Sequence, residues 1–156
     1  MVIKRIMLFV SSCAVLIGLD QLSKWWALVN LMDSDKVLTK NITLSFAWNR
    51  GISWSFFSET SATGNMILSG FIAAVIMIFG TYAVIRFFHN HKSFAEIMVL
   101  SGAISNFIDR LVHGSVIDFI DVHYAGWHWP TFNIADSLVV VGVCGILMKH
   151  IFYEDN

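Results

Sequence analysis

Residues 60–85 contain no charged side chain, and this stretch limits the possible folds more than any other feature of the chain. A helix of about 20 predominantly apolar residues is long enough to cross a hydrocarbon layer of about 30 Å. A helix over residues 60–85 would have no charged face to turn toward water, as a surface helix of a globular protein has. The stretch therefore predicts a membrane-spanning helix.

The composition of the whole chain supports a membrane protein. Of its 156 residues, 56% are hydrophobic and 13% are charged, whereas soluble domains carry about 25% charged residues. Three further apolar runs are interrupted by polar residues, and runs of about 10–14 residues also fit soluble core helices. Because the chain has too few charges to coat a globule, we expect an all-α integral membrane protein. We expect one membrane domain, residues 1–156, with four spans near 5–28, 63–87, 94–112 and 134–152.

The direction of successive spans brings the unusual polar residues to one membrane face. Spans one and three run the same way, and spans two and four run back. The far ends of spans one and three and the near end of span four therefore share a face with the loops 30–60 and 113–133. The polar residues on this face are Asp20, Lys24, Asn106, Asp109, Arg110 and Asp136.

Charge gives little information on partners or orientation. The net charge of −1 shows no basic patch of the kind that binds nucleic acid. Five Lys and Arg residues flank the face with the termini, and three flank the other face, or five if Lys24 and Arg110 are counted. The positive-inside rule therefore leans only slightly toward cytoplasmic termini.

Residues 41–58 alternate between hydrophobic and polar or small side chains, with Asn49-Arg50-Gly51 near the middle. Alternation around a turn that contains glycine is typical of a β-hairpin. We expect a small β-type element here, outside the membrane, that could lie on lipid through its aromatic side chains.

Two groups of polar residues lie inside or at the ends of spans. Asp20 and Lys24 are four residues apart and share a helix face. Asn106, Asp109 and Arg110 share a face of the third span, and Arg110 needs a carboxylate or carbonyl partner. Ionisable residues within a span indicate a functional site by default, but a neutralising pair that anchors the helices is an equally good interpretation of each group.

Asp118 and Asp136 are the sharper candidates, because both have apolar neighbours in the sequence. A structural interpretation exists for Asp136, since an acid in the first turn favours the helix dipole and Asn133 suits the N-cap position. Two carboxylates held together in a poorly solvated site cannot both ionise, so one acts as base and the other as acid. This is the arrangement needed to activate water against an amide without a metal or a covalent intermediate.

Two rival functions fit some of the same residues. A divalent metal site could be built from Asp109, His113, Asp118, Asp121, His123, His128 and Asp136. The chain has no H-E-x-x-H sequence, so we expect no metal. A non-enzymatic transport or proton-relay subunit would also bury charged residues, but it would spread them through the depth of the membrane.

Five short motifs follow one another along the chain. They are Asp20-Gln21-Leu22-Ser23-Lys24, Asn49-Arg50-Gly51, the segment 101–110, Val116-Ile117-Asp118-Phe119, and Phe132-Asn133-Ile134-Ala135-Asp136. These motifs resemble those of the lipoprotein signal peptidase (signal peptidase II) family. Any one motif is weak, but five in the family's order across about 115 residues are specific. Ser101 and Ser105 stand where the family has glycines.

The resemblance implies a monomeric aspartic endopeptidase of the bacterial inner membrane, with its site and its β-type element toward the periplasm. Its substrates would be prolipoproteins whose lipobox cysteine carries diacylglycerol, cleaved just before that cysteine, and globomycin would inhibit it. Asp118 and Asp136 would be the catalytic pair. Supporting roles would fall to Asn49, Gly51, Asn106, Arg110, Asn133, Asp20, Lys24 and Asp109.

Overall fold

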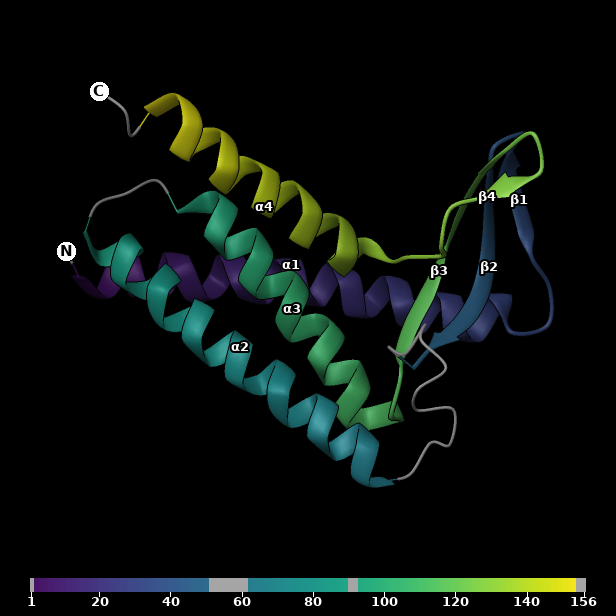
Figure 1. The fold of residues 1–156 in the computed structure, drawn as a ribbon, viewed down its shortest axis with the longest axis horizontal. Coiled ribbons are helices and arrows are strands. Elements are labelled where there is room, and N and C mark those ends of the chain that lie inside the picture. The colour runs from purple at the N-terminus through teal and green to yellow at the C-terminus, as the bar shows by residue number, and fades with distance from the viewer. Residues whose placement is uncertain (1, 51–61, 90–92, 154–156) are drawn as a thin grey trace.

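The computed structural model describes residues 2–50, 62–89 and 93–153, and it has four long helices with a small sheet at one end (Figure 1). The helices are α1 (Val2–Leu31), α2 (Ala62–Phe88), α3 (Phe94–His113) and α4 (Ile134–Tyr153). Both chain termini lie at the end opposite the sheet (Figure 1). Gly51, which the sequence places among the supporting residues, lies outside the described residues.

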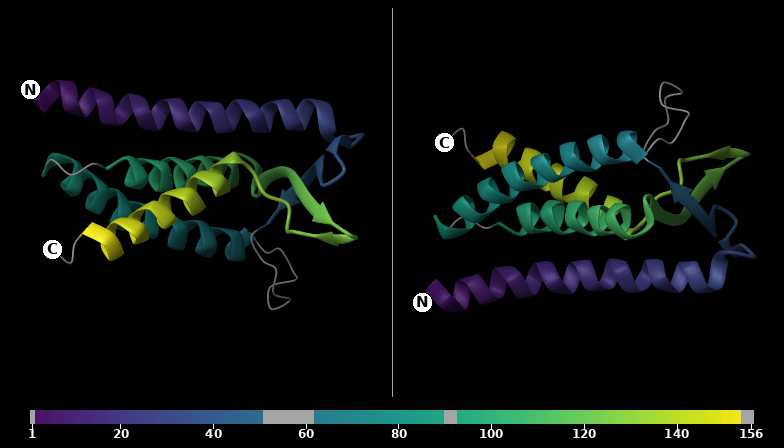
Figure 2. Two further views of the ribbon diagram at one scale, coloured as in Figure 1. Left: turned by 90° about the horizontal axis from the view of Figure 1, so that it is seen from above. Right: turned by 90° about the horizontal axis from the view of Figure 1, so that it is seen from below.

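Three of the described helices, α1, α2 and α4, are long and apolar enough to cross a membrane, by length and composition. The third helix of the chain, α3, does not meet that criterion. It carries Glu96, Asp109 and Arg110 within 20 residues. In the fold, α3 packs against each of the three apolar helices. Figure 2 shows α1 running along one side of the other three helices.

Small residues allow α3 and α4 to approach each other closely. A Cβ atom added to Gly102 of α3 would lie 2.4 Å from the backbone oxygen of Ala135 in α4. A Cβ atom on Gly142 of α4 would lie 2.7 Å from the backbone oxygen of Ala95 in α3. Close approach through small residues is the usual way in which helices pack in a membrane. These contacts hold the start of α4 against the middle of α3, and the middle of α4 against the start of α3.

The sheet has four antiparallel strands in the order β1-β2-β3-β4. The strands are β1 (Lys36–Thr39), β2 (Ile42–Asn49), β3 (Val116–Tyr124) and β4 (Trp127–His128). The turn between β3 and β4 places Ala125 at φ 50° and Gly126 at φ 83°, the left-handed backbone that a tight hairpin turn requires. An isolated bridge from Ile120 to Phe132 ties β3 to the residues that precede α4.

The sheet differs in extent from the sequence prediction. A hairpin turn that was not predicted lies at residues 40–41, and β2 continues to Asn49, where the predicted turn begins, pairing with β1 on one side and β3 on the other. The predicted loop 113–133 contributes β3 and β4. The second half of the predicted hairpin, from residue 51 onward, lies outside the described residues.

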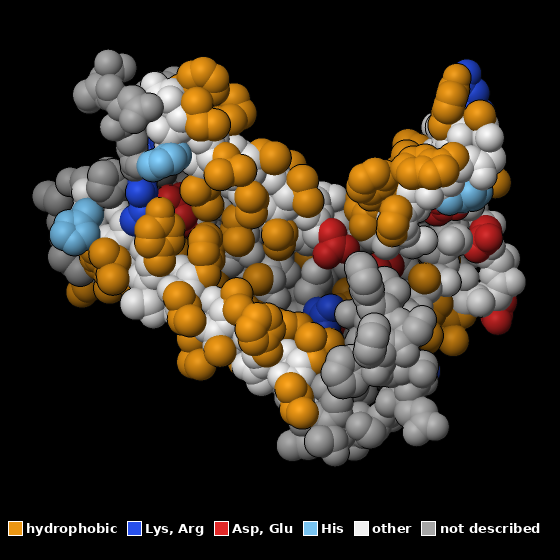
Figure 3. Space-filling view, in the orientation of Figure 1, with side chains coloured by type: hydrophobic (Ala, Val, Ile, Leu, Met, Phe, Trp, Pro, Cys, Tyr) orange, Lys and Arg blue, Asp and Glu red, His pale blue; other side chains and the backbone are white. Residues whose placement is uncertain are grey.

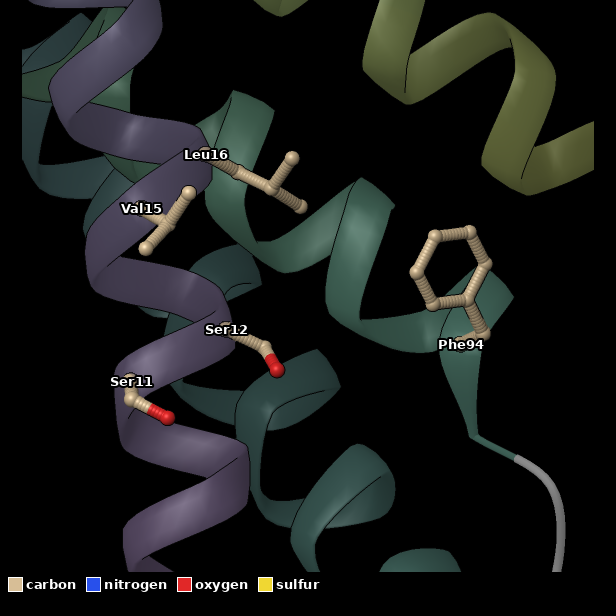
Figure 4. A pocket seen from close by; sticks show the side chains of 5 residues that line it. All are labelled: Ser11, Ser12, Val15, Leu16 and Phe94. Carbon is tan, nitrogen blue, oxygen red and sulfur yellow. The ribbon is translucent and has the colours of Figure 1, made fainter.

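Large apolar side chains cover the outer faces of the helices (Figure 3). Ile78 is 73% exposed and Leu22 is 66% exposed; contiguous apolar surface of this kind marks contact with a membrane or a partner. A hollow of about 260 Å³ opens between α1 and the start of α3, lined by Ser11, Ser12, Val15, Leu16 and Phe94 (Figure 4). The Ser11 hydroxyl donates to the backbone oxygen of Leu8.

Candidate active site

A buried ammonium group organises the polar residues at the sheet end of the helices. Lys24 is 1% exposed, and its Nζ atom lies 2.7 Å from Asp20 Oδ2 and 3.0 Å from Asp109 Oδ2. The same nitrogen donates to Asn106 Oδ1 at 2.8 Å. These three acceptors match the three N–H donors of a lysine side chain. The predicted pairing of Asp20 with Lys24 is confirmed, and it belongs to a larger network.

The two carboxylates that hold Lys24 also accept hydrogen bonds from neighbouring elements. Asp20 of α1 accepts from the backbone N–H of Ala135 in α4 and from the Ser105 hydroxyl in α3, both at 2.7 Å. Asp109 of α3 accepts from the backbone N–H of Ile117 in β3 at 3.1 Å. Removing such charges from water is costly unless they are paired and hydrogen-bonded. The network therefore locks α1, α3, α4 and β3 together.

Two asparagines carry this network to the candidate catalytic residues. Asn106 accepts from Lys24 through Oδ1, and its Nδ2 donates to Asp136 Oδ1 at 2.7 Å. Asn133, which is fully buried, donates from Nδ2 to Asp118 Oδ1 at 2.7 Å and to Asn106 Oδ1 at 3.1 Å. The orientation of each amide is therefore fixed by its partners on both sides.

Asn133 and Asp136 form a reciprocal cap at the start of α4. Asn133 Oδ1 accepts from the backbone N–H of Asp136 at 2.9 Å, and Asp136 Oδ2 accepts from the backbone N–H of Asn133 at 3.2 Å. This is the geometry of a capping box, and it confirms the prediction that Asn133 caps this helix. Because the Asn133 side chain also reaches Asp118, the cap sets the position of one carboxyl relative to the other.

Asp118 is the more deeply buried carboxyl, with 2% of its surface exposed. It faces Ala47 across the sheet, and Asn49 at the end of β2 donates from Nδ2 to Asp118 Oδ2 at 2.8 Å. Burial, with a smaller contribution from the charge of Asp136, raises the pKa of Asp118 to about 6, although the amides of Asn49 and Asn133 and the charge of Lys24 oppose the shift. Asp118 can therefore hold a proton closer to neutral pH than an ordinary aspartate.

Asp136, in contrast, is only partly buried and lines a cavity of about 350 Å³. The other lining residues are Trp129, Phe132, Ser137, Val140 and Val141. In Figure 3 acidic side chains lie at the bottom of a notch between α4 and the sheet, below an apolar rim. An apolar cavity with a few convergent polar groups is the usual form of a binding site.

Arg110 lies one residue beyond Asp109 in α3, and its Nη1 atom is 3.4 Å from the backbone oxygen of Asn106. The charges of Asp136, Asp118 and Asp109 all act on its guanidinium group. Arg110 therefore lies within electrostatic reach of both candidate aspartates, whereas Asp109 forms its ion pair with Lys24.

The geometry supports acid–base chemistry on a bound water molecule. One carboxyl is buried with a raised pKa, and the other opens into the cavity. Two titratable groups whose surroundings differ in this way can divide the roles of acid and base. Among the residues that the structure describes, no group of three or more His, Cys, Asp or Glu side chains is placed to hold a metal ion. Of the candidate metal ligands, Asp121 is hydrogen-bonded to His128, and the His128 ring stacks on the ring of His123.

The structure brings together most of the residues that the sequence singled out. Asn49 reaches Asp118 from the sheet. One hydrogen-bonded network joins the two candidate aspartates to Asp20, Lys24, Asp109, Asn106 and Asn133.

Sequence reasoning assigned no role to two polar residues of the network and to one glycine. Gln21 donates to Asp109 Oδ1 at 2.8 Å and to the Ser105 hydroxyl at 3.0 Å. Ser105 stands at a glycine position of the family motif and supplies a donor to Asp20. Gly102 permits the contact with Ala135. The sequence does contain a signal for Gln21, because this polar residue lies inside the predicted span 5–28.

Comparisons with known proteins agree on one family. A family model described as Signal peptidase (SPase) II matches residues 12–152. The chain is 36% identical to the lipoprotein signal peptidase of Buchnera aphidicola subsp. Baizongia pistaciae, with 100% of this chain and 98% of that protein covered. It is 35% identical to the lipoprotein signal peptidase of Polynucleobacter necessarius subsp. necessarius, with 89% of this chain and 86% of that protein covered.

A solved structure of a bacterial membrane enzyme superposes on the chain with a TM-score of 0.75 at 25% identity, and the match covers 95% of each chain. A second bacterial membrane enzyme superposes with a TM-score of 0.72 at 27% identity, covering 94% of this chain and 91% of the other. Fold and sequence lead to the same conclusion: the chain belongs to the signal peptidase II family of bacterial membrane peptidases.

Proposed function

We propose that the protein is an aspartic endopeptidase that removes the signal peptide from diacylglyceryl-modified prolipoproteins by cleaving before the lipobox cysteine. The observation that carries the proposal is the position of Asn133, whose side chain bonds to Asp118 and caps the helix turn that holds Asp136. Relatives named lipoprotein signal peptidase support the substrate class. The reaction needs only water and two carboxyl groups, so we expect no cofactor.

Asp118 and Asp136 divide the proton transfers of peptide hydrolysis. The ionised carboxylate removes a proton from a water molecule as the water oxygen attacks the scissile carbonyl carbon. The protonated carboxyl donates a hydrogen bond to the carbonyl oxygen, where negative charge develops. The tetrahedral intermediate then collapses as a proton passes to the amide nitrogen of the cysteine, and the carbon–nitrogen bond breaks. The raised pKa of Asp118 makes this residue the better holder of the shared proton.

Substrate would enter from the bilayer along the cavity that Asp136 lines. Trp129, Phe132 and Val140 give this cavity an apolar wall, which suits an acyl chain or an apolar signal peptide. Asn49, Gly51, Asn106, Arg110 and Asn133 would position the peptide or the two aspartates. Asp20, Lys24 and Asp109 would act as scaffold, and the segment 41–58 would hold the peptide at the membrane surface.

We further propose that all four helices cross the bacterial inner membrane as a single monomeric domain, with the sheet and the carboxyl pair toward the periplasm. The arrangement of the termini at the end opposite the sheet supports this placement (Figure 1). The 20 residues of α3 match the length that a span needs. Its ionisable residues are compatible with a span because Asp109 is buried against Lys24.

A transport or proton-relay function is less well supported. Such a function needs polar groups at successive depths of the membrane. Between Glu96 and Asp109, α3 carries no ionisable residue, so the polar networks at its two ends are separated by an apolar stretch with a few small polar residues.

The direct test is incubation of the purified protein with a diacylated prolipoprotein, with and without globomycin, and with a metal chelator in a parallel sample. We expect release of the signal peptide that globomycin blocks and the chelator leaves unchanged. Absence of cleavage would contradict the proposed activity, and loss of cleavage in the chelator would favour a metal peptidase.

A further inference from the structure

The hairpin formed by β3 and β4 has two faces of opposite character. Tyr124 pairs with Trp127 across the hairpin, and His123 pairs with His128. Residues that pair directly across two strands share a face, whereas neighbours along a strand point to opposite faces. The Trp127 ring also contacts the Trp129 ring, with 5.7 Å between the centroids. Tyr124, Trp127 and Trp129 therefore lie on one face, the aromatic face, and the two histidines lie on the other.

The histidine face has its polar groups joined to one another. His128 Nδ1 lies 2.9 Å from the Asp121 carboxylate, and His123 Nε2 lies 3.1 Å from the Thr43 hydroxyl. The two imidazole rings stack with 4.9 Å between their centroids, and the His128 side chain is 58% exposed. This face therefore has the polarity of a surface in contact with water, and its hydrogen bonds hold the hairpin so that the aromatic face points the other way.

The aromatic face leaves large apolar rings open, as far as the described residues show. Tyr124 is 74% exposed, Trp127 is 61% exposed and Trp129 is 56% exposed. A cluster of exposed apolar side chains marks an interaction surface. Tyrosine and tryptophan combine an apolar ring with a polar tip, and they are enriched where a membrane meets water. The composition of the aromatic face therefore matches the head-group layer of a bilayer.

The aromatic face continues onto a part of α4 that fits the hydrocarbon layer. Trp129 lines the cavity beside Asp136 together with Val140 and Val141 of α4. Val140 is 61% exposed and Val141 is 56% exposed, within a helix that is long and apolar enough to cross a membrane. In Figure 3 apolar side chains of the sheet project over the notch toward α4. The hairpin therefore lies beyond the end of this helix, on the side where the helix surface is apolar.

We propose that the β3–β4 hairpin is an interfacial anchor that places Tyr124, Trp127 and Trp129 in the head-group layer of the bilayer, with the histidine face in water. The occupant is lipid rather than a protein, because Trp129 joins the aromatic face to helix surface that a bilayer itself covers. The contact holds the mouth of the cavity beside Asp136 at the level of the head groups. This hairpin is a different element from residues 41–58, and its placement does not depend on the proposed peptidase activity.

The test compares two neighbouring positions of similar exposure on opposite faces, Trp127 and His128. In full-length protein that carries Cys13→Ala and Cys144→Ala, Trp127→Cys and His128→Cys each receive a nitroxide label. The protein is reconstituted in vesicles of phosphatidylethanolamine and phosphatidylglycerol. Electron paramagnetic resonance measures collisions of each label with oxygen, which concentrates in the bilayer, and with a water-soluble nickel chelate. Relative to oxygen, nickel should reach position 127 about fivefold less than position 128, because the first label lies in the bilayer interface.

Three results would overturn the proposal. Equal ratios at positions 127 and 128 would show that the two faces meet the same medium. Loss of access to both oxygen and nickel at position 127 would show that protein covers the aromatic face. Dipolar broadening at position 127 that disappears on dilution with unlabelled protein would assign the face to a second copy of the chain.

A second measurement uses the native tryptophan. Trp127→Phe removes one indole, so the fluorescence difference between the parent protein and this variant reports on Trp127. Phospholipid brominated near the head-group end of its acyl chains should quench this difference by about half, and phospholipid brominated near the chain ends should quench it less. Absence of quenching by both lipids would contradict the proposal. Asp136→Asn should leave every result unchanged, so failure of the peptidase proposal is distinguishable from failure of this one.

Discussion

Asn133 donates a hydrogen bond of 2.7 Å to Asp118 from a fully buried position. The same side chain caps α4 through the backbone N–H of the residue three positions on. One amide side chain therefore links the strand that carries Asp118 to the helix turn that carries Asp136, in addition to the bonds that Asn49 makes to Asp118 and Asn106 makes to Asp136.

Replacement of Asn133 by alanine removes both functions of the amide. We expect loss of nearly all cleavage, because Asp118 loses a donor and Asp136 loses its fixed position, together with about 1 kcal/mol of stability from the lost cap. Asn30→Ala is the matched control, since Asn30 is only partly buried and its side chain donates to the backbone oxygen of Trp26 one turn away. Cleavage rate and thermal unfolding in detergent measure both effects. Normal activity of Asn133→Ala would show that the amide does not position the pair.

The buried ammonium of Lys24 is expected to be essential for folding. Lys24→Met leaves two buried carboxylates, Asp20 and Asp109, without their cation, and breaking a buried pair in this way costs about 3–5 kcal/mol. Lys36→Met serves as control, because Lys36 is exposed and lies over the ring of Trp26. Thermal unfolding should show a large loss for the first variant and almost none for the second. Similar unfolding temperatures for both would contradict the structural role of Lys24.

Sequence and structure agree best where the signal is local. The first span is predicted at 5–28 and the helix covers Val2–Leu31, so each end differs by three residues. The pairing of Asp20 with Lys24 follows from helical spacing alone. Both features depend on residues close together in the chain, where periodicity is informative.

Features that depend on distant residues were not predictable. The bond from Ser105 to Asp20 joins residues 85 positions apart, and no local pattern indicates it. The sequence analysis places β3 within a predicted loop at 113–133, although the Ala125-Gly126 turn after the strand is typical of a hairpin. The buried Glu96 was missed because its burial comes from α2 and α4 rather than from its own neighbours.

The close approach of α3 and α4 gives a prediction on glycine. Gly102→Ala places a Cβ atom 2.4 Å from the backbone oxygen of Ala135, so the start of α4 must shift. Overpacking of this kind costs about 1–3 kcal/mol, and cleavage should fall with stability because Asp136 moves with the helix start. Gly18→Ala is the control, since a Cβ atom there meets nothing within 4 Å. Equal activity of both variants would argue against tight packing at Gly102.

Substitution of Asp136 and substitution of Asn49 should shift the pKa of Asp118 in opposite directions. The protonated carboxyl of Asp118 can be followed by infrared spectroscopy as the band that disappears in Asp118→Asn, and its midpoint should lie near pH 6. Asp136→Asn removes a negative charge that raises the pKa of Asp118, so the midpoint should fall. Asn49→Ala removes a hydrogen bond that favours the ionised form, so the midpoint should rise. A midpoint near pH 4 in the parent protein, or shifts of equal sign, would contradict this description.

The most direct measurement is prolipoprotein cleavage by Asp118→Asn and Asp136→Asn, each purified from membranes and compared with Asp33→Asn at an exposed aspartate. If Asp118 and Asp136 share the acid and base roles, both variants lose cleavage while they remain folded, and Asp33→Asn cleaves like the parent protein. Full activity in either Asp118→Asn or Asp136→Asn would show that the carboxyl pair does not carry the reaction.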